Sequence, residues 1–422
     1  MMDREIFVYI DLNGEAMPVG RLWSRIRKGR ESASFEYDQA WLENPQRFAL
    51  EPALTLAPGP FHTLPGKALF GAIGDSAPDR WGRVLMRRAE HRRARQKGET
   101  PRTLFEADFL LLVDDEARQG ALRFRTDPTG PFLAPENGFR IPPLVELPRL
   151  LSAAERVVAE REDDEDLRLL MAPGSSLGGA RPKASVRDND GHLALAKFPH
   201  CQDDINAVLW EAVALSLASR AGINVPDWRV EQIDGRAVIL VRRFDRVDGI
   251  RIPFLSAMSM LGAADNESHS YLEIADALRQ YGAATKVDLI QLWRRIVFSI
   301  LISNTDDHLR NHGFLYDSHE GWRLSPAYDI NPVPVDIRPR VLSTSIDLND
   351  PTASIDLAME TAEYYGLKPA DAARTAHEVA KAVAGWRAEA ARLGISAREI
   401  RRMASAFEHE DLNKALHLMQ TG

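Results

Sequence analysis

The segment Ile302-Ser303-Asn304-Thr305-Asp306-Asp307-His308-Leu309-Arg310-Asn311 lies between two stretches of opposite character. The preceding residues 287–302 place leucine, isoleucine, valine and tryptophan side chains on one broad face at helical spacing, which predicts a buried helix. Residues 313–316 and 322–324 are short apolar runs around a turn at 317–321, which predicts a hairpin. We therefore expect the polar segment to form a loop between a buried helix and a hairpin.

Three side chains in this region have the order that phosphoryl transfer requires. Such a transfer uses one carboxylate to orient the attacking hydroxyl, an amide oxygen on Mg²⁺, and a second carboxylate that links the metal to the phosphates. Asp306 and Asn311 have the Asp-x-x-x-x-Asn spacing of a kinase loop, and Asp329 follows after one hairpin. The alternative is local: Asp306 and Asp307 would turn the chain after the helix, and Asn311 and His308 would satisfy loop backbone groups.

A lysine and a glutamate supply the second requirement, a cation for the nucleotide phosphates and a carboxylate to hold it. Residues 183–187 and 192–198 predict a hairpin around Asp188-Asn189-Asp190-Gly191, and Lys197 ends an otherwise apolar strand face. A helix predicted over residues 204–221 carries Glu211 beside core-facing positions. A strand lysine and a glutamate from the following helix form the ion pair of kinases. The alternative is an edge-strand lysine whose aliphatic stem lies on the surface.

A glycine-rich loop, residues 173–183, enters the first strand of that hairpin. Its Gly178 and Gly179 would let backbone N–H groups approach a phosphate closely. The loop matches neither the Walker sequence nor Gly-x-Gly-x-x-Gly, so a plain flexible linker is the alternative.

The remaining pattern predicts an α+β fold of kinase-like, two-lobed organisation. Strand-like runs at residues 6–10, 19–23 and 34–37 are separated by the turn signals Asn13-Gly14 and Lys28-Gly29. A further hairpin is expected at residues 228–243, and the C-terminal part is mostly helical, with a capping-box sequence at residues 396–399. We expect a small α+β N-terminal subdomain (1–110), a hairpin-rich nucleotide-binding lobe (111–245) and a helical catalytic lobe (246–422).

Composition excludes several classes of protein. The 422 residues carry a formal net charge of −8, which gives no general attraction to nucleic acid. The single cysteine, Cys201, cannot form an intrachain disulfide, and the charged N-terminus does not resemble a secretory signal, so we expect a cytoplasmic protein without a membrane span. Residues 80–97 are strongly basic, which indicates either a solvated helix face or a docking surface for nucleic acid. The acidic run at 160–166 is expected to be an exposed helix end or linker.

Taken in order, these motifs resemble those of the HipA family of bacterial Ser/Thr kinases, the toxins of HipBA toxin–antitoxin pairs. The resemblance spans nearly the whole chain, because Val19-Gly20-Arg21-Leu22 and Ala77-Pro78-Asp79-Arg80-Trp81-Gly82 are similar to the family's N-terminal subdomain. The other matching stretches are Ser176-Leu177-Gly178-Gly179-Ala180-Arg181-Pro182-Lys183, Leu195-Ala196-Lys197-Phe198-Pro199, Arg243-Phe244-Asp245-Arg246, Asn304-Thr305-Asp306-Asp307-His308-Leu309-Arg310-Asn311 and Ala327-Tyr328-Asp329-Ile330.

The resemblance implies a role for each matching residue. Asp306 would be the catalytic base, with Asn311 and Asp329 as Mg²⁺ ligands. ATP would be bound by the site residues Lys197, Glu211, Gly178, Gly179, Arg242, Phe244, His308, Asn311 and Asp329, with adenine against the backbone of Arg242 and Phe244. Arg242 departs from the acidic residue common at that place.

The resemblance also implies regulation and partners. Ser176, or its neighbour Ser175, would be autophosphorylated, which would eject the glycine-rich loop and inactivate the enzyme. The implied partners are a HipB-like helix-turn-helix antitoxin, operator DNA bound mainly through the antitoxin, and a protein substrate such as an aminoacyl-tRNA synthetase.

Three other functions fit part of the sequence. The Asp-x-His-x-x-Asn pattern from Asp306 also resembles the catalytic loop of phosphoinositide kinases, which suggests a lipid or small-molecule acceptor. A non-catalytic regulator that supports DNA binding would use only the basic segment. A metallohydrolase would need one metal site made by Asp306, Asp307, His308, His312 and Asp329, and it would leave Lys197 and Glu211 without a role.

Overall fold

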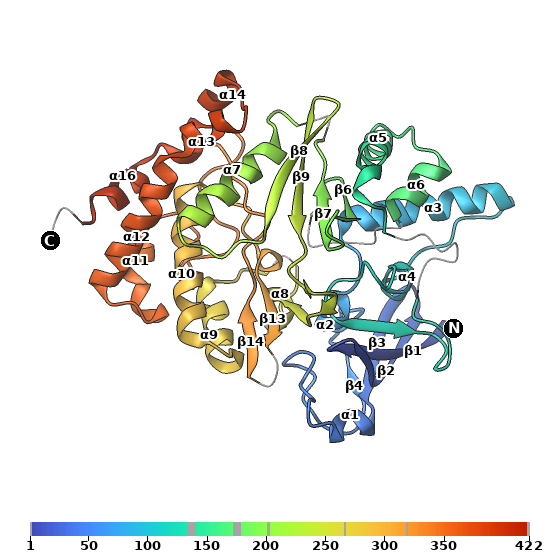
Figure 1. Ribbon diagram of the computed structural model, residues 1–422. Helices are drawn as coiled ribbons and strands as arrows, with labels where there is room; N and C mark the ends of the chain where they lie inside the picture. Colours follow the sequence, from blue (N-terminus) through green and yellow to red (C-terminus); the bar gives the residue numbers. More distant parts are fainter. Residues whose placement is uncertain are drawn as a thin grey trace. The chain divides into compact units, whose positions relative to one another are not determined.

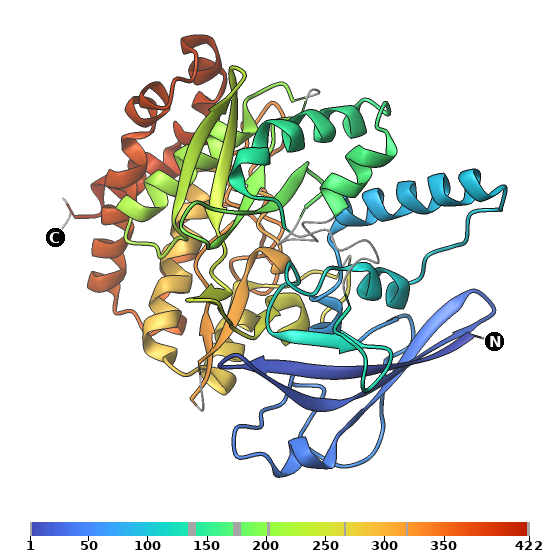
Figure 2. The same cartoon turned by 45° about the vertical axis from the view of Figure 1, so that its right-hand side comes forward.

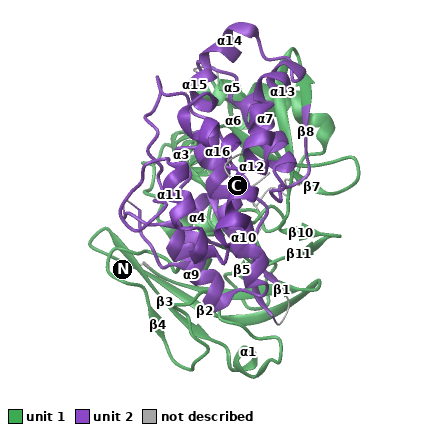
Figure 3. Cartoon of the chain, turned by 90° about the vertical axis from the view of Figure 1, so that its left-hand side faces the viewer, with its two compact units in different colours: residues 1–202, 231–255 green, residues 203–230, 256–422 purple. Residues whose placement is uncertain are grey.

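The computed structural model describes residues 2–133, 141–171, 179–200, 203–265, 267–317 and 320–419. The chain divides into two compact units (Figure 3). Unit 1 comprises residues 1–202 and 231–255, and unit 2 comprises residues 203–230 and 256–422. Helices and several sheets both contribute, so the fold is α+β as expected (Figure 1).

Unit 1 begins with a five-stranded sheet in the order β4-β3-β2-β1-β5 (Figure 2). Its three longest strands extend beyond the predicted runs. The reason is the turns: Asn13-Gly14 and Lys28-Gly29 all have positive φ, and a two-residue turn leaves the strands paired up to its edge. The strands are β1 (Met2–Leu12), β2 (Glu15–Arg27), β3 (Arg30–Tyr37), β4 (Phe61–His62) and β5 (Leu122–Arg125).

The second sheet of unit 1 contains the predicted hairpins, in the order β6-β7-β9-β8. One of its faces packs against α5 (Leu147–Val158) and α6 (Asp164–Met171) through small and branched side chains such as Ala196 and Leu240. The strands are β6 (Lys183–Arg187), β7 (Leu193–Lys197), β9 (Arg236–Arg242) and β8 (Trp228–Ile233), which contains the boundary between the units. The unit's other elements are α1 (Gln39–Glu43), α2 (Gly71–Gly74), α4 (Glu106–Leu112), η1 (Leu144–Glu146), β10 (Arg246–Val247) and β11 (Ile250–Arg251).

The basic run forms one helix, α3 (Arg80–Lys97), and four of its eight arginine and lysine side chains form ion pairs with described residues of unit 1. The helix lies beside α6 (Figures 1 and 2). The acidic run joins α5 to the first turn of α6, as expected of a helix end or linker. It also pairs with α3, since Arg88 is 3.0 Å from Glu162 and Arg92 is 3.4 Å from Asp164. Neither interpretation from the sequence anticipated this pairing, because it joins segments about seventy residues apart.

Unit 2 is mostly helical around α10 (Thr285–Leu301), the buried helix expected before the polar loop. The predicted helix at 204–221 is α7 (Ala207–Arg220), and Gly222 with φ of 72° follows its end as expected. The predicted hairpin is β13 (Gly313–Asp317) and β14 (Gly321–Leu324). The other helices are α8 (Ala257–Met260), α9 (Tyr271–Tyr281), η2 (Leu309–Asn311), α11 (Ile355–Glu360), η3 (Ala362–Tyr365), α12 (Pro369–Ala384), α13 (Trp386–Arg392), α14 (Ala397–Arg402), α15 (Ala404–Phe407) and α16 (Glu410–His417), and β12 (Phe254–Ser256) lies at the boundary.

The capping-box sequence before α14 is used differently from the prediction. Ser396 accepts a hydrogen bond from the Glu399 backbone, as an N-cap should. The Glu399 carboxylate instead accepts hydrogen bonds from Asn206 N at 2.6 Å and Trp210 Nε1 at 2.9 Å, and thereby joins α14 to the start of α7.

Candidate active site

The polar loop after α10 is fixed by one asparagine. Ser303 has a φ of 52° and reverses the chain, and Asn304 N then donates to Ser299 O at 2.8 Å. The Asn304 amide donates to Ser299 Oγ at 3.3 Å and accepts from Asn331 N at 3.2 Å. Asn304 thus connects the end of α10, the loop, and the segment that carries Asp329. Sequence reasoning included Asn304 in a motif but gave it no such role.

Asp306 lies at the surface of unit 2, where a carboxylate can meet a hydroxyl from another molecule. Its side chain is 66% exposed, and its Oδ1 is 2.8 Å from Arg338 Nη1. The local turn uses the Asp306 carbonyl, which accepts from His308 N at 2.9 Å. The carboxylate itself is therefore bound to Arg338, not to the turn backbone.

Asp307, the next residue, has the opposite environment. It is buried and accepts hydrogen bonds from Tyr271 Oη at 2.6 Å and Ser299 Oγ at 3.2 Å, and its Oδ1 is 3.0 Å from His312 Nε2. Burial raises the pKa of Asp307, but the opposing effects of His312 and the two hydrogen bonds are larger, so the pKa lies below its usual value. Asp307 therefore anchors the loop from beneath, while its neighbour Asp306 faces outward.

Asn311 provides the test of whether this site suits a metal ion. Its Nδ2 donates to Asp306 O at 3.2 Å, and this bond sets the orientation of the amide. The Asn311 Oδ1 atom is buried and has no hydrogen-bond partner among the described residues. A buried acceptor without a donor is costly, and an amide oxygen is a preferred ligand of Mg²⁺. The residues present therefore fit a Mg²⁺ ion at Asn311.

A small cavity lies beside Asn311, within unit 2. It offers about 10 Å³ of water-accessible space, room for one water molecule. Its lining residues are Ile223, Arg295, Phe298, Ser299, Asn304, Asp307, Asn311, His312, Ala327, Tyr328 and Ile330.

The residues on both sides of Asp329 are hydrogen-bonded to the polar loop at residues 302–311, and the loop and this segment together are called the frame. Before it, Tyr328 Oη donates to Arg310 O at 2.7 Å, and after it Asn331 N donates to Asn304. Asp329 itself has a φ of 56°, a left-handed backbone that aspartate and asparagine adopt more readily than most residues. Asp306, Asn311 and Asp329 are thus held on one hydrogen-bonded frame.

Two other predicted residues also lie in unit 2. His308 is half-buried before η2, and its Nδ1 has no hydrogen-bond partner among the described residues. Glu211 is buried on α7. Lys197 belongs to unit 1, so its ion pair with Glu211 stays a prediction.

Within unit 1, Lys197 ends β7, which has a neighbour on each side. It lies opposite Lys183 of β6 and opposite Ile239 of β9, so the alternative of an edge-strand lysine was wrong. Lys183 has its own partner, because its Nζ is 3.0 Å from the buried carboxylate of Asp79. The sheet face that ends with Lys197 therefore carries a second lysine, Lys183, whose charge is paired with Asp79.

The described end of the glycine-rich loop lies next to this lysine. Gly179 has a φ of 93°, and a Cβ there would lie 3.2 Å from the Lys183 ammonium nitrogen. Both observations favour glycine at this position. Gly178, Ser175 and Ser176 lie outside the described residues.

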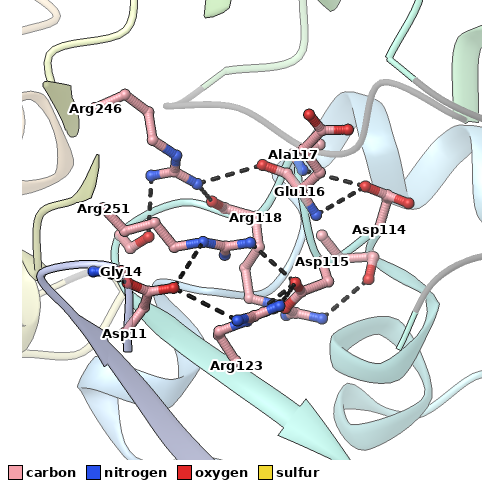
Figure 4. Close-up of polar contacts among 12 residues, drawn as sticks. Asp11, Gly14, Asp114, Asp115, Glu116, Ala117, Arg118, Arg123, Arg246 and Arg251 are labelled. Atoms are coloured by element: carbon pink, nitrogen blue, oxygen red, sulfur yellow. Dashed lines mark hydrogen bonds and ion pairs between the residues drawn. The ribbon is translucent and has the colours of Figure 1, made fainter. Parts of the chain in front are cut away.

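The predicted adenine-binding segment, Arg242 to Phe244, is followed by a buried charged cluster. The Asp245 carboxylate binds Arg243 and Arg246 and accepts Gly120 N at 2.8 Å. Burial raises the pKa of Asp245, but the two arginines lower it further than burial raises it. Arg246 also donates to the carbonyls of the loop at residues 116–120 (Figure 4). The Arg243-Phe244-Asp245-Arg246 motif is therefore an anchor for the segment, a role that the sequence did not reveal.

A neighbouring cluster connects β11 to the first sheet of unit 1. Arg123 and Arg251 converge on Asp115, at 2.6 Å and 2.9 Å, and Asp11 of β1 completes the group (Figure 4). The anchor of the Arg242 to Phe244 segment is thus continuous with the N-terminal sheet.

The described residues contain neither a cluster of metal-ligating side chains nor a helix suited to a membrane. No group of three or more His, Cys, Asp or Glu side chains lies close enough together to hold a metal ion, so the metallohydrolase site is not assembled there. Among the described helices, we find none with the length and apolar character to cross a membrane.

Comparisons with known proteins concern the fold and the family of the chain. A solved chain described as the "Shewanella oneidensis MR-1 Toxin Antitoxin System HipA, HipB and its operator DNA complex" superposes with a TM-score of 0.65 at 16% identity, covering 99% of this chain and 97% of that one. At this identity, the likeness shows the fold. A Sinorhizobium fredii protein named "Putative kinase Y4mE" is 26% identical over 346 residues, 74% of this chain and 75% of the relative. A Haemophilus influenzae protein named "Putative kinase" is 24% identical over 193 residues, 38% of this chain and 54% of the relative.

Two family models match the sequence itself. The model of the HipA N-terminal domain matches residues 10–107, and the model of the HipA-like C-terminal domain matches residues 175–386. The second match includes Lys197, Asp306 and Asp329 and spans half of the chain, and so the chain belongs to the HipA family.

Proposed function

We propose that this chain is an ATP- and Mg²⁺-dependent serine/threonine protein kinase that acts as the toxin of a toxin–antitoxin pair. The observation that carries the proposal is the buried Oδ1 of Asn311, which has no hydrogen-bond partner in the described part of the chain and is connected by hydrogen bonds to the segments of the exposed Asp306 carboxylate and Asp329. The names of the two kinase relatives and the family membership support it.

In this proposal, the chain's own residues position the reactants. Asp306 accepts a hydrogen bond from the substrate hydroxyl and orients it, while Asn311 Oδ1 and the Asp329 carboxylate hold the metal. Bound Mg²⁺ would neutralise the negative charge of the phosphates. Lys197 provides a cation for the phosphates, with Glu211 as its partner, and the backbone of Arg242 and Phe244 holds adenine. Catalysis then comes mainly from positioning and fixed charge.

Transfer from labelled ATP tests the proposal. We expect the wild type with Mg²⁺ to label itself or added protein, and we expect no labelling by Asp306→Asn or Asp329→Asn. Asp317→Asn is a matched control, because Asp317 is also an exposed aspartate of unit 2. Equal labelling by all variants would refute the assignment of Asp306 and Asp329 to the active site. Calorimetry without Mg-ATP binding would instead favour the non-catalytic regulator.

Regulation and partners complete the proposal. Autophosphorylation of Ser176, or of Ser175, would place negative charge where the nucleotide phosphates bind, and peptide mapping by mass spectrometry would identify the serine. The Shewanella HipA was solved with HipB and operator DNA, which supports a HipB-like antitoxin through which this chain would contact DNA. An aminoacyl-tRNA synthetase is the proposed class of substrate, and phosphoproteomics with an Asp329→Asn control would test it.

A further inference from the structure

The segment after Asp329 exposes apolar side chains. Twelve large hydrophobic side chains are exposed among the described residues, and four of them lie between residues 335 and 348. These four are Val335, Ile337, Val341 and Leu348, with exposures between 43% and 68%. Three of these four, Val335, Ile337 and Val341, lie within seven residues of the chain, and an exposed apolar cluster is typical of a surface that binds a partner.

This segment is held against the loop that carries Asp306. Several hydrogen bonds connect the two segments, and three of them show how the segment is held to backbone carbonyls of the loop. They are Val333 N to Ser303 O at 3.1 Å, Ser343 N to Thr305 O at 3.1 Å, and Thr344 Oγ1 to Asp307 O at 2.7 Å. The exposed apolar side chains therefore belong to a fixed surface beside Asp306.

Arg338, in the middle of this surface, binds the carboxylate that we propose orients the substrate hydroxyl. Its Nη1 is 2.8 Å from Asp306 Oδ1, and its Nη2 donates to Ser343 Oγ at 3.3 Å. Both partners are exposed, at 42% for Arg338 and 66% for Asp306, and exposed ion pairs are easily exchanged. The other arginine nearby, Arg340, is bound to Asp411 at 2.6 Å.

We propose that residues 335–341, here called the docking strip, bind the polypeptide that carries the phosphate-accepting hydroxyl. Arg338 would exchange Asp306 for an Asp or Glu carboxylate of that polypeptide, while Val335, Ile337 and Val341 contact its aliphatic side chains. This inference rests on the proposed kinase function and adds a substrate class to it: a serine or threonine with an acidic and an aliphatic residue close by.

The charge arrangement argues for this occupant. A guanidinium forms its strongest hydrogen bonds with a carboxylate, and the exchange leaves Arg338 with such a partner while freeing Asp306 to accept the hydroxyl hydrogen bond. Without an acidic residue, Arg338 stays on Asp306 and competes with the hydroxyl. Recognition of the acidic residue is thereby coupled to release of the catalytic carboxylate.

A library of serine-containing peptides, each with one fixed neighbouring residue, tests the proposal with labelled Mg-ATP. We expect the wild type to prefer Asp or Glu over Asn or Gln at one position, and Arg338→Gln to lose that preference. Arg387→Gln is the matched control, because Arg387 is also exposed in unit 2 and pairs with Glu408 at 2.6 Å outside the docking strip, and it should keep the preference. Ile337→Ser should weaken the aliphatic preference, whereas Val287→Ser, at an exposed valine of α10, should not.

The outcomes separate this inference from the proposed function. Peptide labelling without an acidic preference, or a preference that survives in Arg338→Gln, would overturn the docking strip and leave the kinase standing. Self-labelling without any peptide labelling would also overturn it. If the wild type transfers phosphate to nothing, the kinase proposal itself fails. A shift of Ile337→Ser to a smaller species in ultracentrifugation would assign the strip to a second copy of the chain and refute the inference.

Discussion

Asp306 and Asp307 are adjacent carboxylates, and we predict that replacing each by asparagine has opposite consequences. Asp306→Asn removes an exposed ion pair and should cost about 0–1 kcal/mol of unfolding free energy while abolishing phosphate transfer. Asp307→Asn removes the charge from a buried group that binds Tyr271, Ser299 and His312.

The magnitude for Asp307→Asn follows from those three contacts. The hydrogen bonds from Tyr271 and Ser299 change from a charged to a neutral acceptor, which costs roughly 1 kcal/mol each. The attraction to His312 at 3.0 Å is lost, and an Asn amide group facing that ring adds to the cost. The sum, about 3 kcal/mol, is at the lower end of the roughly 3–5 kcal/mol for breaking a buried pair. For a unit of this size, it corresponds to a decrease in Tm of roughly 6–12 °C.

Urea unfolding followed by circular dichroism measures the difference, because unit 2 is mostly helical. The pH dependence gives a second check. The pKa of Asp307 is lowered by folding, so its contribution is present above the unfolded pKa of about 3.9 and is lost as the pH falls through the folded pKa. The gap between wild type and Asp307→Asn should therefore shrink in acid. Equal unfolding midpoints for the two variants at pH 7 would refute this account of the loop.

Three further variants test other parts of unit 2. Glu389→Gln should lower the unfolding free energy by about 3 kcal/mol at pH 7, because the hydrogen bond from Arg392 lowers the pKa of Glu389 to about 2. Urea titrations at several pH values would measure this loss, which should disappear as the pH falls from about 4.5 to about 2. Trp386→Ala removes a ring stacked on Phe407 at 4.5 Å and should cost about 3–5 kcal/mol in the same assay. Asn304→Ala should reduce the rate of phosphate transfer by about 10²-fold in a labelled-ATP assay, by loosening the frame around Asp306.

The parts of the fold that depend on neighbouring residues could be predicted from the sequence. The turns at Asn13-Gly14 and Lys28-Gly29 have positive φ, which asparagine and glycine adopt more readily than other residues, so these pairs predict two-residue hairpin turns. The apolar face before Ile302 predicts a buried helix, because only burial removes that face from water. The family was also within reach, because the motifs keep their order along the chain.

The environments of individual side chains could not be predicted, because they depend on residues far away in the sequence. Nothing local distinguishes exposed Asp306 from buried Asp307; the difference comes from Tyr271, thirty-six residues earlier. Lys183 finds its carboxylate in Asp79, 104 residues away. The Arg338 partner of Asp306 could not be predicted either, since nothing in the local sequence distinguishes Arg338, which binds Asp306, from Arg340, which binds Asp411.

The left-handed backbone at Asp329 decides which substitutions give a clear test of its carboxylate. Alanine there would lose the carboxylate and also force a side chain with no compensating hydrogen bond into a strained conformation, so its phenotype would mix two causes. Asparagine tolerates the same conformation and isolates the charge. Glycine also removes the carboxylate ligand, but it adopts the left-handed backbone without strain. Comparing the three variants would separate the contribution of chain geometry from that of the oxygen ligands at a single position.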